Sequence, residues 1–160
     1  MTEESIEFLA AVEADLRANK DRTDALDEIF QSSFTEGAEV LEKASWCLAK
    51  MAQNKCHDMR VYDILISMYP DADDPVAENI AWGLGEMAGS GIGTYDALNA
   101  LKKLTCSDVS TVRSTAAWAI GRYHHRLCLS DPESMECLEF LLEDCSELVR
   151  RSARFAIDDE

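Results

Sequence analysis

The stretch VRSTAAWAIGRYH, residues 112–124, decides the fold because three other stretches of the chain are versions of it. They read VLEKASWCLAKMA from residue 40, VAENIAWGLGEMA from residue 76 and VRRSARFAIDDE from residue 149. Trp46, Trp82 and Trp118 therefore follow one another at intervals of 36 residues, and Phe155 takes the place of a fourth tryptophan. A period of this length is typical of solenoids, in which each unit buries its apolar side only against its neighbours.

The apolar spacing indicates two helices in each unit. Val112, Ala116 and Ala119 share one side of a helix, and the matching columns of the other copies also mix small with large apolar residues. Small residues in these columns predict that successive first helices approach closely. The second helix of each unit is marked by a leucine three residues before another apolar side chain. These column leucines are Leu26, Leu65, Leu98 and Leu138. The sequence therefore predicts an all-α fold, an alpha-alpha superhelix of stacked antiparallel helix pairs.

We expect a single domain over residues 1–160. Residues 1–35 are predicted to form a capping helix pair at the N-terminus, and residues 147–160 a terminal half repeat. The full repeats are predicted at residues 36–72, 73–108 and 109–146. Asp-Pro pairs at residues 74–75 and 131–132 support two of the helix starts, because an acid caps a helix and proline suits its first turn.

The segment AAWAIG at residues 116–121, which follows Val112 and Arg113, resembles the first helix of HEAT repeats, especially the HEAT-like units first described in phycobilin lyases. IAWGLG at residues 80–85 is a second match, and ASWCLA at residues 44–49 is a looser one. The resemblance covers residues from about 36 to 160. It implies a solenoid whose second helices line the concave side. The arginine that usually follows the valine in this family occurs only in the last two copies.

The tryptophans lie off the main apolar stripe of their helices. At about 100° per residue, Trp46 falls among Glu42, Lys43 and Lys50. Two arrangements are compatible with this position: the rings fill the grooves between successive first helices, or they form an exposed aromatic row. We favour the grooves.

Acidic residues dominate the charge, with 31 acids against 15 bases and a net charge of −16. Such a field repels phosphate groups, so neither nucleic acid nor an anionic membrane is expected as a ligand. An acid stands two residues before each column leucine, at Asp24, Asp63, Asp96 and Glu136. On the concave side that the resemblance implies, these acids would form a strip facing a basic peptide or protein. The alternative is that they only complement the helix dipole in the first turns.

Basic residues gather instead in the last copy. Arg150, Arg151 and Arg154 can cluster on one face of the final helix, next to apolar side chains such as Leu148. This face is a candidate surface for association with another copy of the chain. The alternative is that the preceding repeat covers the apolar side of the helix.

No catalytic or metal-binding arrangement is recognisable. The six cysteines include no CxxC pair, which is typical of reduced thiols in a cytoplasmic protein. His124 and Cys128 are four residues apart, but two ligands do not make a metal site. The loop at residues 89–93 is glycine-rich, but it follows a helix and lacks the lysine of a Walker sequence. We therefore expect no metal and no cofactor.

These observations predict a non-catalytic protein-binding scaffold or adaptor that uses the concave surface of the solenoid. The alternative is an enzyme or enzyme subunit of the phycobilin lyase-like class. The acidic start MTEES is unlike a secretory signal, and no apolar run approaches the length of a membrane span. The expected location is the cytoplasm.

Overall fold

The computed structural model describes residues 2–34 and 37–158, and within them the chain is helical and has no strand. Two short 3-10 turns lie at Thr23–Ala25 and Tyr69–Asp71. The helices of the described part are α1 (Thr2–Arg17), α2 (Leu26–Ser32), α3 (Ala38–Gln53), α4 (Met59–Met68), α5 (Asp74–Gly89), α6 (Tyr95–Leu104), α7 (Ser110–Leu127), α8 (Pro132–Leu141) and α9 (Glu147–Asp158). The predicted all-α superhelix is confirmed. The boundary expected between residues 35 and 36 lies outside the described residues.

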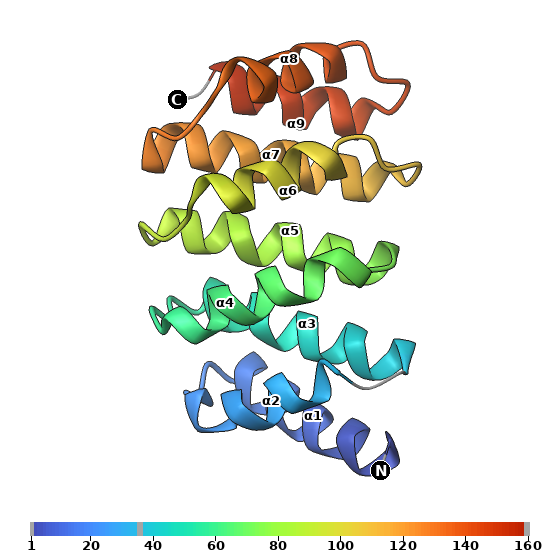
Figure 1. Ribbon diagram of the computed structural model, residues 1–160, viewed down its shortest axis with the longest axis vertical. Coiled ribbons are helices and arrows are strands. Elements are labelled where there is room, and N and C mark those ends of the chain that lie inside the picture. The colour runs from blue at the N-terminus through green and yellow to red at the C-terminus, as the bar shows by residue number, and fades with distance from the viewer. Residues whose placement is uncertain (1, 35–36, 159–160) are drawn as a thin grey trace.

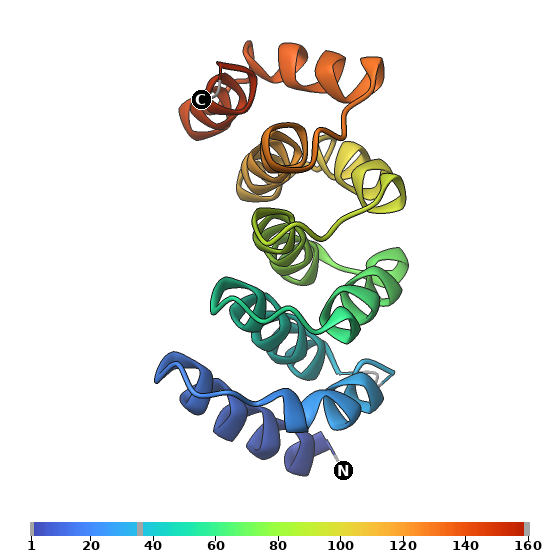
Figure 2. The same ribbon diagram turned by 90° about the vertical axis from the view of Figure 1, so that its left-hand side faces the viewer.

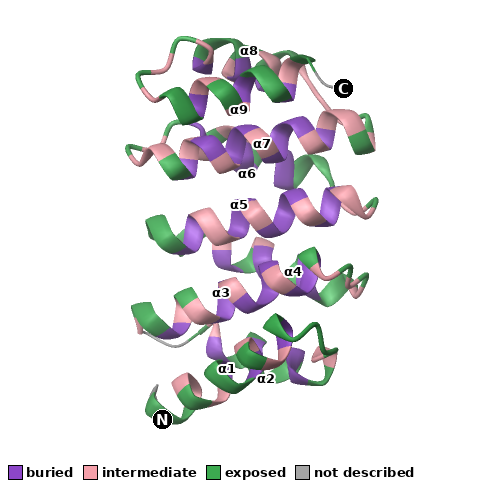
Figure 3. Ribbon diagram, turned by 180° about the vertical axis from the view of Figure 1, so that it is seen from behind, coloured by how far each residue is buried: buried purple, intermediate pink, exposed green. Residues whose placement is uncertain are grey.

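The helices form two layers (Figure 1). The first helices of the units, α1, α3, α5, α7 and α9, stack on one another in one layer, and α2, α4, α6 and α8 form the other. The column leucines between the layers are at most 1% exposed. Figure 3 shows that buried residues run along the first helices from α3 to α9. The core is therefore one continuous band, as expected of a solenoid.

The first helices approach one another almost backbone to backbone. A methyl group on Gly121 of α7 would lie 2.7 Å from Cα of Ala156 in α9. A methyl group on Gly83 of α5 would lie 3.3 Å from Cα of Ala49 in α3. Glycine at these positions thus permits a spacing that larger residues would prevent, as the small-residue columns predicted.

This close spacing decides the curvature of the stack. Figure 2 shows the second helices splayed further apart than the first helices, so that the stack bends around the first-helix layer. A stack curves toward its more tightly packed layer, and the concave side is accordingly lined by α1, α3, α5, α7 and α9. The placement of the second helices on the concave side, which the HEAT resemblance implied, is therefore wrong.

Local caps fix the helix starts. Asp131 accepts the N–H of Ser134 at 2.7 Å, and the Ser134 hydroxyl accepts the N–H of Asp131, which completes a capping box at α8. At α5 the cap is Asp73, whose carboxylate accepts the N–H of Val76. Asp74 is already the first helical residue, one position later than its predicted capping role.

A half-buried ion pair links the start of α7 to the turn between α8 and α9. The Arg113 guanidinium makes two contacts of 2.9 Å with the Asp144 carboxylate and also donates to the Ser107 carbonyl at 2.9 Å. Arg150 donates to the main-chain carbonyl of Asp144 at 2.7 Å. Arg113 of α7 and Arg150 of α9 therefore both hold the turn between α8 and α9.

Candidate functional site

The three tryptophans lie on the concave layer and are all half-buried. Trp118 packs against Gly85 of the neighbouring helix α5, whereas Trp46 and Trp82 contact each other, so the expected grooves are seen for Trp118 and stay a prediction for the other two rings. We call Trp46, Trp82 and Trp118 the aromatic row. A row of half-buried indole rings offers apolar area together with a face that attracts cations.

The three tryptophans are equally spaced in the sequence, but their rings are not equally spaced in the fold. Trp46 and Trp82 touch edge to face, with ring centroids 6.0 Å apart and an interplanar angle of 64°. Trp118 instead lies across Gly85 of α5, where a methyl group would be 2.3 Å from its Cζ3 atom. Ala49 is the residue of α3 that matches Gly85, and its methyl group prevents Trp82 from settling in the same way. The first two rings therefore meet, and the third is set apart.

A hollow of about 350 Å³ lies between Trp82 and Trp118. Its other lining residues are Glu78, Asn79 and Glu86 of α5, Ser114 and Thr115 of α7, and Ser152 of α9. The indole N–H of Trp82 donates to Glu86 at 3.3 Å, which orients both side chains. The hollow thus combines two aromatic rings with two carboxylates and several hydroxyl groups. This set of groups suits a cationic side chain that also has an apolar stem.

Two arginines of the chain already lie over rings of the aromatic row. The Arg17 guanidinium of α1 is 4.4 Å from the ring centroid of Trp46, and its Nε donates to Glu13 at 3.0 Å. The Arg122 guanidinium is 5.4 Å from the ring centroid of Trp118. Arg122 is held more firmly, because it donates to the Gly85 carbonyl at 3.3 Å and fills the space left by the missing side chain of Gly89.

The predicted acidic strip lies elsewhere. Its four members are Asp24, Asp63, Asp96 and Glu136, and all four are exposed on the second-helix side. Asp24 pairs with Arg22 at 3.0 Å. Because the second helices lie on the convex side, the acids do not share a face with the aromatic row. A binding role for them stays a prediction and now concerns the convex surface.

The predicted association surface on α9 is only partly available. Arg150 is engaged with the turn before α9, whereas Arg151 is exposed and pairs with Glu147 at 3.1 Å. Arg154 is exposed as well. The apolar residues Val149, Ala153 and Ala156 are fully buried within the chain, as in the alternative interpretation. Leu148 and Phe155 remain 49% and 61% exposed, so self-association stays a prediction that depends on them.

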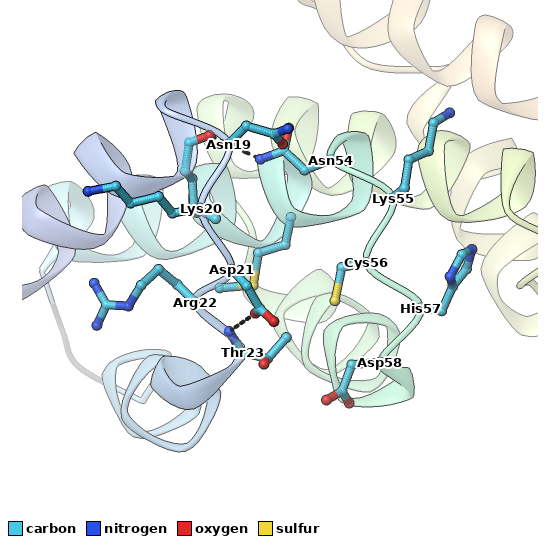
Figure 4. Close-up of a pocket in the computed structure, with 12 residues that line it drawn as sticks. Asn19, Lys20, Asp21, Arg22, Thr23, Asn54, Lys55, Cys56, His57 and Asp58 are labelled. Atoms are coloured by element: carbon cyan, nitrogen blue, oxygen red, sulfur yellow. Dashed lines mark hydrogen bonds between the residues drawn. The ribbon is translucent and has the colours of Figure 1, made fainter.

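A second hollow, of about 440 Å³, lies between the connection from α1 to α2 and the connection from α3 to α4 (Figure 4). Figure 4 shows the Cys56 sulfur turned into this hollow, whereas Lys55 points away from it. Burial raises the pKa of the Cys56 thiol, which lowers its reactivity as a nucleophile. Asp21 is held by the N–H of Thr23 at 2.8 Å, and this hydrogen bond lowers the pKa of the carboxyl. The side chains around Cys56 therefore do not activate it.

In the described residues, no group of three histidine, cysteine or acidic side chains is placed to hold a metal ion. Cys128 lies just beyond α7 with a left-handed φ of 55°, so it does not share a helical face with His124. None of the helices of residues 2–34 and 37–158 is both long enough and apolar enough to span a membrane.

The two layers and the concave aromatic row define a class of proteins, the curved helical-repeat solenoids. The family model for HEAT repeats matches residues 62–158, and the chain belongs to the HEAT-repeat family. The predicted family is thereby confirmed, and the finer resemblance to phycobilin lyases stays a prediction.

Two relatives extend this assignment. The chain is 29% identical over 145 residues to importin subunit alpha-9 of Arabidopsis thaliana, an alignment that covers 83% of this chain and 26% of that protein. It also resembles the structure of a designed armadillo repeat protein in complex with the peptide (KR)4. That match has a TM-score of 0.67 and 21% identity, and it covers 84% of this chain and 64% of the designed one. The chain thus spans about a quarter of the importin subunit and slightly less than two thirds of the designed protein.

Proposed function

We propose that this chain is a protein-binding scaffold that holds an extended segment of a partner along its concave face. A cationic side chain of that segment enters the hollow between Trp82 and Trp118. The observation that carries the proposal is the hollow itself, an open space of about 350 Å³ between two half-buried indole rings on the inner surface of the curve.

The lining residues favour a cation over an anion. The faces of Trp82 and Trp118 attract a positive charge, an effect of about 0.5–2 kcal/mol that grows as water is excluded. Glu78 supplies negative charge to the hollow, and Glu86 adds a second carboxylate that lies 3.9 Å from the Arg122 guanidinium. Tryptophans in the centre of an interface commonly dominate the binding energy. A lysine or arginine side chain is therefore the expected anchor.

The dimensions also suit an extended peptide. Packed helices are about 8–10 Å apart, and an extended chain advances about 3.3 Å per residue. A segment lying across the stack therefore crosses one repeat in about three residues. The designed armadillo repeat protein forms its complex with a basic peptide, (KR)4, which makes the same peptide the natural probe here.

The test is a calorimetric titration with (KR)4 at about 150 mM salt. Because the chain has a net charge of −16, a basic peptide is also attracted without any specific site. Trp82→Ala leaves every charge in place and is expected to weaken binding at least about fivefold. The charge-changing variant Asp63→Lys/Asp96→Lys tests the convex acids and is expected to weaken binding less. Equal binding by Trp82→Ala and the parent would overturn the proposal.

The enzymatic alternative has its own measurement. A phycobilin lyase-like activity implies binding of a chromophore, which an absorbance spectrum taken after incubation with a bilin would show. Bilin absorbance that stays with the protein through gel filtration would favour this alternative over the scaffold.

A further inference from the structure

We infer that Arg17 is an internal competitor of the ligand. Its guanidinium lies over the ring of Trp46, 4.4 Å from the centroid, and so withholds this ring of the aromatic row from a ligand. The inference rests on the proposed function, since it concerns the same concave surface. The inference names the ring of the aromatic row that a ligand cannot reach, Trp46, and the residue that covers this ring, Arg17.

One anchor position for a cationic side chain on the aromatic row is open, and another is already filled. Between Trp46 and Trp82 no side chain can enter, because the rings touch with centroids 6.0 Å apart. On the α1 side of Trp46, the Arg17 guanidinium is already in contact at 4.4 Å. Between Trp82 and Trp118, by contrast, the row borders an open hollow of about 350 Å³. A ligand with two cationic side chains therefore finds one anchor position free and the other filled by a chemically equivalent group.

Arg17 is suited to being displaced. Its side chain is 60% exposed, and its ion pair with Glu13 at 3.0 Å joins residues four apart on the surface of α1. Lys43 lies 3.8 Å from the same Glu13 carboxylate, so Glu13 keeps a cationic partner when Arg17 moves. Arg122 differs, because its side chain is only 22% exposed and is fixed against α5. Arg17 is thus the arginine that a ligand can replace.

A short peptide can reach both positions. The hollow and the α1 side of Trp46 are about two repeats apart, which corresponds to about 20 Å at the usual helix spacing. An extended peptide of eight residues spans about 26 Å. The peptide (KR)4 is therefore long enough to place one cation in the hollow and a second on Trp46 once Arg17 is removed.

The experiment compares (KR)4 binding by the parent, Arg17→Ala and Arg60→Ala at about 150 mM salt. Both variants remove one positive charge from an exposed ion pair, but Arg60 belongs to α4 on the convex side. Arg17→Ala is expected to bind about two- to fivefold more tightly than the parent, the range of one exposed cation–π contact. Arg60→Ala is expected to change binding less than about 1.5-fold, because the Debye length is about 8 Å at this salt concentration.

The same comparison in protein that carries Trp46→Ala makes the test specific. In Trp46→Ala protein, the further change Arg17→Ala is expected to give no gain, because the ring that Arg17 covers is gone. Equal gains in Arg17→Ala and Arg60→Ala, or a gain that survives in the Trp46→Ala background, would overturn the inference and leave the proposed function standing. Absence of (KR)4 binding by every variant would overturn both.

Discussion

Asp144→Ala removes the carboxylate that ties the turn between α8 and α9 to Arg113 of α7. The Arg113 and Asp144 side chains are 13% and 9% exposed and make two contacts of 2.9 Å. Hydrogen bonds to charged groups contribute about 1.5–3 kcal/mol. The pair lies in surface turns where water can approach after the change, so we expect a loss of about 2 kcal/mol. For a domain of this size that corresponds to a fall in Tm of about 4–8 °C.

The assay is urea unfolding followed by circular dichroism and by tryptophan fluorescence. Arg151→Ala is the matched control, because its ion pair with Glu147 is 68% exposed on both side chains and is expected to contribute within about 0.5 kcal/mol. A two-state transition for each variant is needed before the free energies are compared. A loss for Asp144→Ala no larger than the loss for Arg151→Ala would refute the structural role of the pair between Arg113 and Asp144.

Three further predictions concern pH, packing and association. The Arg113 guanidinium lowers the pKa of the Asp144 carboxyl in the folded state. The ionised carboxyl therefore stabilises the fold above its unfolded pKa of about 4, and this stabilisation is lost as the pH falls below about 4. In Asp144→Asn, the free energy of unfolding should depend less on pH in that range. Gly121→Ala should destabilise the fold by about 1 kcal/mol in chemical unfolding, although alanine favours helices, because the new methyl group would meet the backbone of α9. If α9 mediates self-association, Arg151→Glu/Arg154→Glu should lower the mass measured by light scattering, and a mass equal to that of the parent at low and high salt would exclude it.

The repeat period predicted the fold correctly, but the family resemblance misassigned the concave side. Which layer faces inward depends on which layer packs more closely, and that in turn depends on small residues such as Gly83 and Gly121. Gly83 was visible in the small-residue columns of the first helices, whereas Gly121 lies one position beside them. Their consequence for curvature follows only when the weaker contacts of the second helices are known, and those depend on loop lengths that vary from unit to unit.

The candidate site was predicted in part. The 36-residue period placed the aromatic row on the first helices, but it gave no sign that Trp46 and Trp82 touch while Trp118 stands apart. That difference depends on a single methyl group, present in Ala49 and absent in Gly85. The residues three before and four after each tryptophan share its exposed face, and this spacing would have revealed Asn79 and Glu86. The acidic column was predicted as the binding surface instead, but acids are favoured at helix starts on either side of the stack, so their position does not mark the concave face.

Binding of the partner segment by the concave aromatic row can be observed at the tryptophans themselves. Nuclear magnetic resonance of the indole N–H groups is the sharpest test, because the three tryptophans give three separate reporters on that face. On addition of (KR)4, we expect the signals of Trp82 and Trp118 to shift in a saturable way and the signal of Trp46 to change less. Unchanged signals of Trp82 and Trp118, together with shifts in the backbone amides of α4, α6 and α8, would show that the peptide binds the convex side instead.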